Sequence, residues 1–155
     1  MRRRQATKRE PKGDPKFNSP VIGHFINIVM VKGKKSIAQG IVYDSFDVIK
    51  EKLKDDPAKI FFAALDNARP RLEVRPRRIG GATYQVPQEV TKDRGISIAL
   101  RWIRDFARAK KGKAMKIKLA DEIVSPFKNE GSAVKKKEDT HKMAEANRAF
   151  AHFKW

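Results

Sequence analysis

The chain has 155 residues, a size typical of one folded domain, and 40% of them are hydrophobic, which is enough for a buried core. Lysine and arginine number 36 against 18 acidic residues, so the net charge is +18 and the favoured partner is a polyanion. The positive residues are spread along the whole chain, which favours nucleic acid over a membrane surface. No apolar run of about eighteen residues is present to span a bilayer, and the lack of cysteine excludes disulfides and thiolate metal sites.

The first 17 residues are predicted to form a basic arm. Six lysines or arginines between positions 2 and 12 face a single acid, Glu10, and the segment has too few apolar residues to order itself. It also lacks the apolar stretch of a secretory signal. We interpret it as an arm that binds nucleic acid, with a solvated tail as the alternative. The candidate contacts in the arm are Arg2, Arg3, Arg4, Lys8 and Arg9.

Residues 18–155 are predicted to form a single domain with six helices, because apolar residues recur there at helical spacing. Ser19 before Pro20 and Asp56 before Pro57 are typical helix starts. Pro126 has no backbone N–H and disfavours helix just before it, which leaves the end of the fifth helix open. The predicted helices run from 20 to before 33, from about 36 to 55, from 57 to before 70, around 96–106, around 120–127, and from about 132 to the end of the chain.

A β-hairpin is predicted at about residues 72–90. Two strand-like stretches meet at Gly80 and Gly81, and a pair of glycines supplies the positive φ angles that a tight hairpin turn needs. The fold class that follows is mainly α: a bundle of six helices with a two-stranded β-hairpin projecting between the third and the fourth.

Arginines point to both faces of this predicted ribbon. Arg77 and Arg78 are neighbours in a strand and must face opposite ways, while Arg75 shares the face of Arg77. We therefore expect a ribbon with no dry side, whose arginines are free to meet a nucleic acid on both faces. Tyr84 is a candidate for stacking on a base, with packing inside the protein as the alternative.

The segment of the fourth helix carries positive residues spaced 7, 3, 4 and 3 apart, which places them on one face if the segment is continuously helical. Their like charges repel one another and only Asp105 interrupts the row, so a phosphate-contacting stripe is favoured over a solvated face with acids nearby on other helices. Lysines at 135–137 are followed at once by acids and are interpreted as solvated helix surface. The candidate contacts are Arg94, Arg101, Arg104, Arg108 and Lys111 in the stripe, Lys113, Lys116 and Lys118 after it, and Lys32, Lys34 and Lys35 in the turn after the first helix.

No catalytic constellation is evident in the sequence. The three histidines stand at no metal-ligand spacing, and the VKGKKS segment at 31–36 lacks the first glycine of a phosphate-binding loop because position 28 is isoleucine. We expect no catalytic residues, no metal site, no cofactor and no small-molecule substrate.

The chain resembles a known family almost from end to end, and four stretches of its sequence carry the resemblance. They are VKGKKSIAQGIVYDSF at 31–46, LEVRPRRIGGATYQVPQEV at 72–90, ISIALRWI at 96–103 and KKKEDTHKMAEANRAFAHF at 135–153. Their order and length are similar to those of the bacterial-type ribosomal protein seven of the small subunit. The fold of that family, six helices with a β-ribbon between the third and the fourth, agrees with the fold predicted from periodicity.

The resemblance also implies a function. Members of the family are structural constituents of the small ribosomal subunit in the cytoplasm and primary binders of its ribosomal RNA, in the 3′ major domain. They nucleate assembly of the subunit head, with the hairpin near the exit-site tRNA and the mRNA, and neighbouring head and platform proteins are expected partners.

Two other classes of protein stay open. A DNA-binding architectural or regulatory protein would use the fourth helix as a recognition helix, although a short helix-turn-helix unit is missing. An RNA-processing enzyme would need an acid cluster near the basic face.

Overall fold

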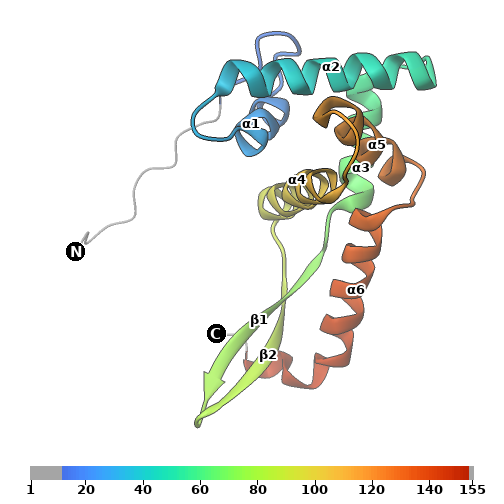
Figure 1. The fold of residues 1–155 in the computed structure, drawn as a ribbon. Coiled ribbons are helices and arrows are strands. Elements are labelled where there is room, and N and C mark those ends of the chain that lie inside the picture. The colour runs from blue at the N-terminus through green and yellow to red at the C-terminus, as the bar shows by residue number, and fades with distance from the viewer. Residues whose placement is uncertain (1–11, 154–155) are drawn as a thin grey trace.

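The computed structural model describes residues 12–153 of the chain, and its first half is helical (Figure 1). Three α-helices come first: α1 Pro20–Val29, α2 Lys35–Leu53 and α3 Pro57–Ala68. Two of them begin as predicted. Ser19 has an extended backbone before Pro20, and the Asp56 side chain accepts a hydrogen bond of 3.1 Å from the Ala58 N–H.

The hairpin and three further α-helices follow. They are β1 Leu72–Ile79, β2 Ala82–Glu89, α4 Lys92–Ala109, α5 Met115–Phe127 and α6 Ser132–Ala146, with a final 3₁₀ helix, η1 Arg148–Phe153. The predicted fold class is therefore confirmed, with the hairpin between the third and the fourth helix. None of the helices within residues 12–153 is long and apolar enough to cross a membrane.

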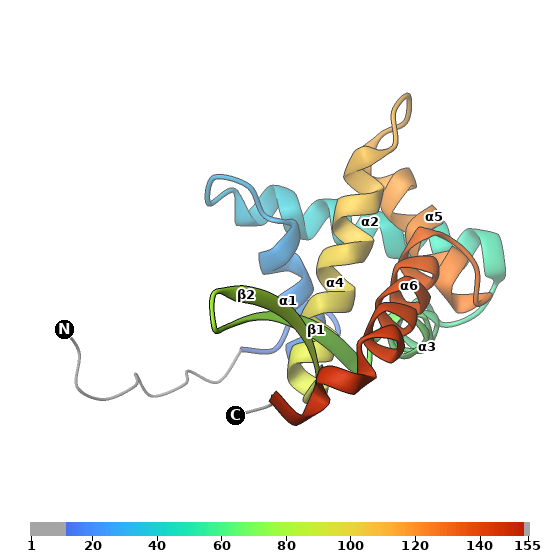
Figure 2. The same ribbon diagram turned by 90° about the horizontal axis from the view of Figure 1, so that it is seen from below.

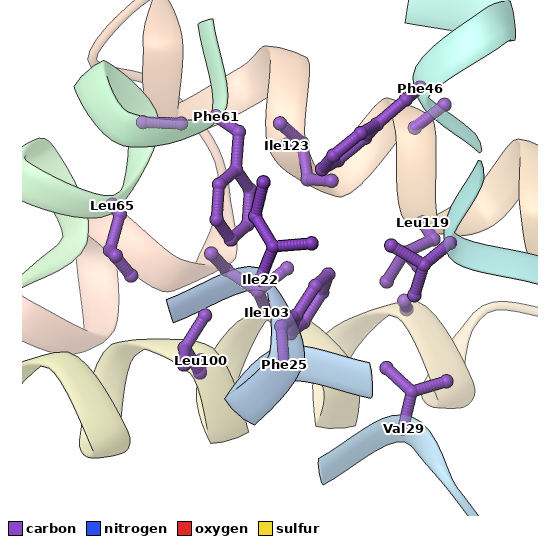
Figure 3. Close-up of a cluster of buried hydrophobic side chains, with 14 of the residues drawn as sticks. Ile22, Phe25, Val29, Phe46, Phe61, Leu65, Leu100, Ile103, Leu119 and Ile123 are labelled. Carbon is purple, nitrogen blue, oxygen red and sulfur yellow. The ribbon is translucent and has the colours of Figure 1, made fainter. Parts of the chain in front are cut away.

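The hydrophobic core contains side chains from each of the five helices α1, α2, α3, α4 and α5 (Figure 3). The fully buried ring of Phe61 in α3 lies between Phe25 of α1 and Phe46 of α2, with centroid separations of 5.2 and 5.4 Å. Leu100 of α4 and Ile123 of α5 complete this part of the core, and both are fully buried. The apolar stripes predicted for α1, α2 and α3 lie in this core or pack against it, whereas Phe127 and Met143, which were predicted to lie on the stripes of the fifth and sixth helices, are exposed.

The chain folds onto α2 before the first helix begins. Asp14 is 2% exposed, and its carboxylate accepts hydrogen bonds of 3.0 Å from the N–H groups of Lys16 and Phe17. It also accepts one of 2.6 Å from the Tyr43 hydroxyl of α2. Burial, together with this bond to Asp14, raises the pKa of Tyr43 to about 12. The last residues of the segment predicted as an arm are thus anchored to the domain.

The hairpin turn has the geometry that its sequence predicts. Gly80 and Gly81 adopt φ angles of +55° and +90°, and the strands pair directly from Ile79 with Ala82 to Leu72 with Glu89. Arg75 stands opposite Val86 in this register. The ribbon extends away from α4 on the side where α6 lies (Figure 1).

The ribbon nevertheless has a buried side, so the expectation of no dry side was wrong. Val86 is fully buried, and the Tyr84 ring lies 5.2 Å from Phe150 and 5.6 Å from Phe153 of η1, between ring centroids. Helix α6 and η1 run beside the hairpin in both ribbon views (Figures 1 and 2). Phe150 and Phe153, which are 66 and 69 positions after Tyr84, supply this cover, and strand alternation alone does not reveal it.

The sixth helix also ends earlier than predicted. It stops at Ala146 and does not run to the end of the chain. The side-chain amide of Asn147 donates a hydrogen bond of 2.8 Å to the Met143 carbonyl and competes for a backbone acceptor of the helix. The chain then tightens into η1, which brings Phe150 and Phe153 to the hairpin.

Pro126 does not end the fifth helix, because α5 continues through it to Phe127. The proline lies in the last turn, where only one backbone hydrogen bond is lost. The Ser125 hydroxyl donates to the Asp121 carbonyl at 2.9 Å, and the Glu130 N–H donates to the Ser125 carbonyl at 2.9 Å. These bonds close the C-terminal end of the helix.

Helix α6 is tied by two polar contacts to the segment that runs from the end of α3 to the start of the hairpin. The Arg71 N–H donates a hydrogen bond of 3.0 Å to Nε2 of His141, and the Lys137 ammonium donates one of 2.7 Å to the Asn67 carbonyl at the end of α3. Nε2 can accept only when it carries no proton. Burial, followed by the charges of Lys137 and Arg71, lowers the pKa of His141.

Acidification is therefore expected to loosen α6 from the hairpin. A histidine whose pKa is lower in the folded than in the unfolded state stabilises the fold fully above its ordinary pKa near 6.5, and loses this contribution as the pH falls through the lowered value. Loss of the hydrogen bond should cost about 1 kcal/mol of unfolding free energy. Urea unfolding at pH 7.5 and 5.5 measures this, and His141→Gln, which keeps an acceptor, should show a smaller difference between the two pH values. An equal pH dependence in both proteins would contradict the assignment.

Candidate nucleic-acid interface

The turn between α1 and α2 presents three lysines to solvent. Lys32 and Gly33 adopt positive φ angles of 52° and 75°, and the Lys34 N–H donates to the Val31 carbonyl at 3.1 Å. Lys32, Lys34 and Lys35 are all exposed. This tight turn therefore concentrates three charges in a short segment, which we call the basic turn.

The predicted stripe is not wholly on α4, because the helix ends at Ala109 and Lys111 lies beyond it. The members on α4 differ in the contacts that they make. Arg94, at the start of the helix, donates to both carboxylate oxygens of Glu73 at 2.9 Å. The Arg75 guanidinium reaches the same carboxylate at 2.5 Å. Glu73 is 13% exposed, so this acid partly neutralises two of the predicted contacts at the base of the hairpin.

Arg104 and Arg108, further along α4, face α1. Arg108 donates a hydrogen bond of 3.0 Å to the Val29 carbonyl, and Arg104 donates one of 3.4 Å to the Ile28 carbonyl. Both carbonyls belong to the last turn of α1, where no later N–H group of the helix is available to donate to them.

Arg101 is exposed and lines a shallow surface hollow together with Ser97 of the same helix. Nε2 of His24 lies 3.2 Å from the Ser97 hydroxyl, which joins α1 to this part of α4. Burial, followed by the positive charge of Arg101, lowers the pKa of His24. The stripe thus keeps an exposed cation at its centre.

The lysines after α4 form a second basic segment, residues 110–118, which comprises the connection after α4 and the first turn of α5 and which we call the basic loop. Lys110 contacts the buried Glu122 at 2.6 Å, and Lys116 contacts Asp44 of α2 at 3.2 Å. Lys113 lies 3.7 Å from Asp121. Burial alone would raise the pKa of Asp121, but its hydrogen bond with Lys52 and the charges of the neighbouring lysines lower it.

Most lysines of the basic loop remain accessible despite these contacts. Lys111, Lys113 and Lys116 are exposed, and Lys118 is half-buried. Exposed ion pairs of this kind hold their partners weakly, so the ammonium groups can exchange an acid for a phosphate.

The residues of the hairpin that were predicted to contact nucleic acid differ in their exposure to solvent. Arg78 is exposed beside the turn, and Arg75 and Arg77 are half-buried. Tyr84 packs against Phe150 and Phe153, which is the alternative to base stacking considered for it. The predicted contacts in the arm, Arg2, Arg3, Arg4, Lys8 and Arg9, lie outside the described residues.

Two acids that shape this surface were not predicted from the sequence. Glu73 shares a strand face with Arg75, two positions away, which was a usable signal. Glu122 sits on the apolar side of α5 at 2% exposure and shows no such signal. Within residues 12–153, no group of three His, Asp or Glu side chains is arranged to hold a metal ion.

Comparison with known proteins adds to this geometry. Residues 1–148 match the family model described as ribosomal protein S7p/S5e. The chain belongs to this family. It is 60% identical to the small ribosomal subunit protein uS7 of Thermotoga maritima over the full length of both chains. It is 59% identical to the protein of that name from Thermotoga neapolitana, also over both full lengths, and 54% identical to the one from Thermodesulfovibrio yellowstonii over 99% of each.

The S7p/S5e match covers the hairpin and every predicted contact, since these lie between residues 2 and 118. The resemblance found from four sequence stretches is thereby confirmed. A basic surface built from the basic turn, α4 and the basic loop is consistent with the RNA binding and translation associated with the S7p/S5e family.

Proposed function

We propose that this protein is a structural constituent of the small ribosomal subunit and binds its ribosomal RNA. The full-length similarity to proteins named for that subunit carries the proposal. The exposed lysines of the basic turn and the basic loop support it, because they lie on a rigid helical framework and suit a partner with a dense phosphate backbone.

The physical task of this surface is to neutralise phosphates where RNA segments converge. Lysine and arginine release condensed counterions when they bind, so segments that repel one another can pack on the protein. Arginine adds planar hydrogen bonding and stacking on exposed bases, which suits Arg101 and Arg78 because both are exposed.

The finer proposal follows the family. The protein binds the 3′ major domain of small-subunit ribosomal RNA as a primary binder and nucleates assembly of the subunit head on cytoplasmic ribosomes. Its hairpin lies near the exit-site tRNA and the mRNA, and head and platform proteins are its neighbours. The projection of the ribbon beyond the helices supports this role, since its tip can reach a partner that the helices do not touch (Figure 1).

The DNA-binding alternative is less well supported. A recognition helix needs a face free to enter a groove. Helix α4 packs against α1, α3, α5 and α6, and Leu100 and Ile103 are fully buried. Its two arginines next to α1 are already hydrogen-bonded to that helix.

An enzymatic role is also less well supported, and we propose that the protein acts without catalysis or a cofactor. Three acids beside the basic loop, Asp44, Asp121 and Glu122, each contact a lysine. Carboxylates paired in this way serve to hold the framework, and the membership in a ribosomal protein family agrees with such a role.

A competition experiment tests the proposed function. A labelled fragment of the 3′ major domain is bound to the protein on filters and challenged with DNA or unrelated structured RNA of equal length. We expect the unlabelled fragment to compete at least about tenfold better than either, as specific complexes exceed non-specific ones. Equal competition by all three would contradict the proposal.

The basic turn should supply part of the salt dependence. Replacing Lys32, Lys34 and Lys35 by alanine is expected to lower the slope of log affinity against log salt by about 2 to 3, since each phosphate contact contributes roughly 0.7 to 0.9. The matched control replaces Lys135, Lys136 and Lys142, three exposed lysines of α6, and should leave the slope unchanged. Equal slopes in the two triple variants would place the interface elsewhere.

A further inference from the structure

The C-terminal end of α1 is completed by another helix. Its last turn has no basic residue of its own, and the carbonyls of Ile28 and Val29 lie beyond the reach of the intrahelical ladder. Arg104 and Arg108 of α4 donate to these carbonyls at 3.4 and 3.0 Å. Two positive charges at the negative end of a helix dipole add to the attraction.

The Arg104 guanidinium is occupied on a second side. Asp105 accepts hydrogen bonds from it at 2.7 Å, and the side chain is only 23% exposed. A guanidinium that is paired with an acid and also donates to a carbonyl has few N–H groups left to donate to a phosphate. Arg108 is more exposed, yet it makes the shorter of the two bonds to α1.

These bonds lie where two basic segments meet the helices. Val29 is the last residue of α1 and is followed directly by the basic turn, while Arg108 lies in the last turn of α4 just before the basic loop. Both segments project from the helical part in Figure 2, the turn in blue and the loop in yellow and orange. Fixing the end of α1 to the end of α4 therefore fixes the spacing between the two clusters of lysines.

We infer that Arg104 and Arg108 are positioning residues, which align the basic turn with the basic loop so that one folded RNA binds both. The inference rests on the proposed function and narrows it. The partner is an RNA in which two backbone segments are held at a set distance, because a rigid pair of clusters gains affinity only for such a partner. A flexible single strand can adapt to any spacing between the two clusters, so it gains nothing from their alignment.

The alignment can be measured without RNA. The chain has no cysteine, so Ile37→Cys in α2 and Ala114→Cys beside the basic loop accept spin labels at two exposed positions. Pulsed electron paramagnetic resonance should give a narrow distance distribution in this protein and a broader one after Arg104→Ala and Arg108→Ala are added. Arg101→Ala, on the same helix, is the control and should leave it narrow. An unchanged distribution in the double variant overturns the inference.

RNA binding gives the second measurement. The double variant should bind a folded fragment of the 3′ major domain about tenfold more weakly, because two clusters that are no longer aligned lose the advantage of preorganisation. Its affinity for polyuridylate should be unchanged, and its salt slope on the folded fragment should stay the same because the lysines still meet phosphates. Arg101→Ala should instead lower that slope by about 0.7 to 0.9.

Failure of the inference is distinguishable from failure of the proposed function. If Arg104 and Arg108 contact phosphates directly, the double variant loses slope and binds both RNAs more weakly, which overturns the positioning role but keeps the RNA-binding one. If the unaltered protein does not prefer the folded fragment, the proposed function fails whatever the spin labels show. If the double variant does not fold, the Arg108→Lys variant replaces it. A lysine keeps the charge but not the geometry of the guanidinium, so the same broadening of the distance distribution is expected. A narrow distribution in this variant overturns the inference.

Discussion

Replacing Phe61 with alanine is expected to lower the free energy of unfolding by about 3 to 5 kcal/mol, the range found when a large aromatic side chain is removed from a packed core. Phe61 is fully buried in α3 and its ring contacts Phe25 and Phe46, which come from α1 and α2 (Figure 3). The change therefore leaves a cavity at the meeting point of three helices. Urea unfolding followed by circular dichroism measures the loss.

The neighbouring Phe62 provides the matched control for this change. It lies on the same helix with its ring 5.6 Å from that of Phe61, but it is 38% exposed. Phe62→Ala should cost less than about 1.5 kcal/mol, because part of its apolar surface is already in water. Equal losses for the two variants would show that α3 is not held by the core seen in the structure.

The helical framework could be predicted from the sequence because its signals are local. Apolar spacing of 3 and 4 places residues such as Phe25 and Phe61 on buried stripes, and both are fully buried. Asp56 before Pro57 caps α3 as expected, and Gly80 with Gly81 forms the hairpin turn. Each of these features depends on residues within a few positions of one another.

The contacts that divide the candidate interface are not local, and the sequence does not reveal them. Arg108 and the Val29 carbonyl that it binds are separated by 79 positions, and the carbonyl is a backbone group that any residue type would supply. The cover over Tyr84 comes from Phe150 and Phe153, after a helix end set by Asn147. An even row of arginines therefore predicted one uniform surface, whereas tertiary packing gives its members different partners.

Replacing Lys110 with alanine is expected to destabilise the protein more than any other single change in the basic loop. Lys110 lies 2.6 Å from the carboxylate of Glu122, which is 2% exposed and whose other oxygen, Oε2, has no hydrogen-bond partner among the described residues. Removing a partner of a buried pair costs about 3 to 5 kcal/mol, and because Lys110 is 42% exposed we expect the lower figure of about 2 to 3 kcal/mol. Glu122→Gln in the same chain should recover most of the loss, since it removes the buried charge.

Lys113→Ala is the control, because it removes the same charge from the same loop. Its partner Asp121 is 27% exposed and keeps Lys52 at 2.5 Å, so the loss should stay below about 1 kcal/mol. Chemical unfolding measures both single variants. A double-mutant cycle is completed by measuring Glu122→Gln and the Lys110→Ala/Glu122→Gln double variant as well. If Lys110→Ala costs no more than Lys113→Ala, the contact with Glu122 does not hold the loop. A large coupling would instead show that Lys110 fixes the start of the basic loop through Glu122, whereas Lys111, Lys113 and Lys116 stay exposed to solvent.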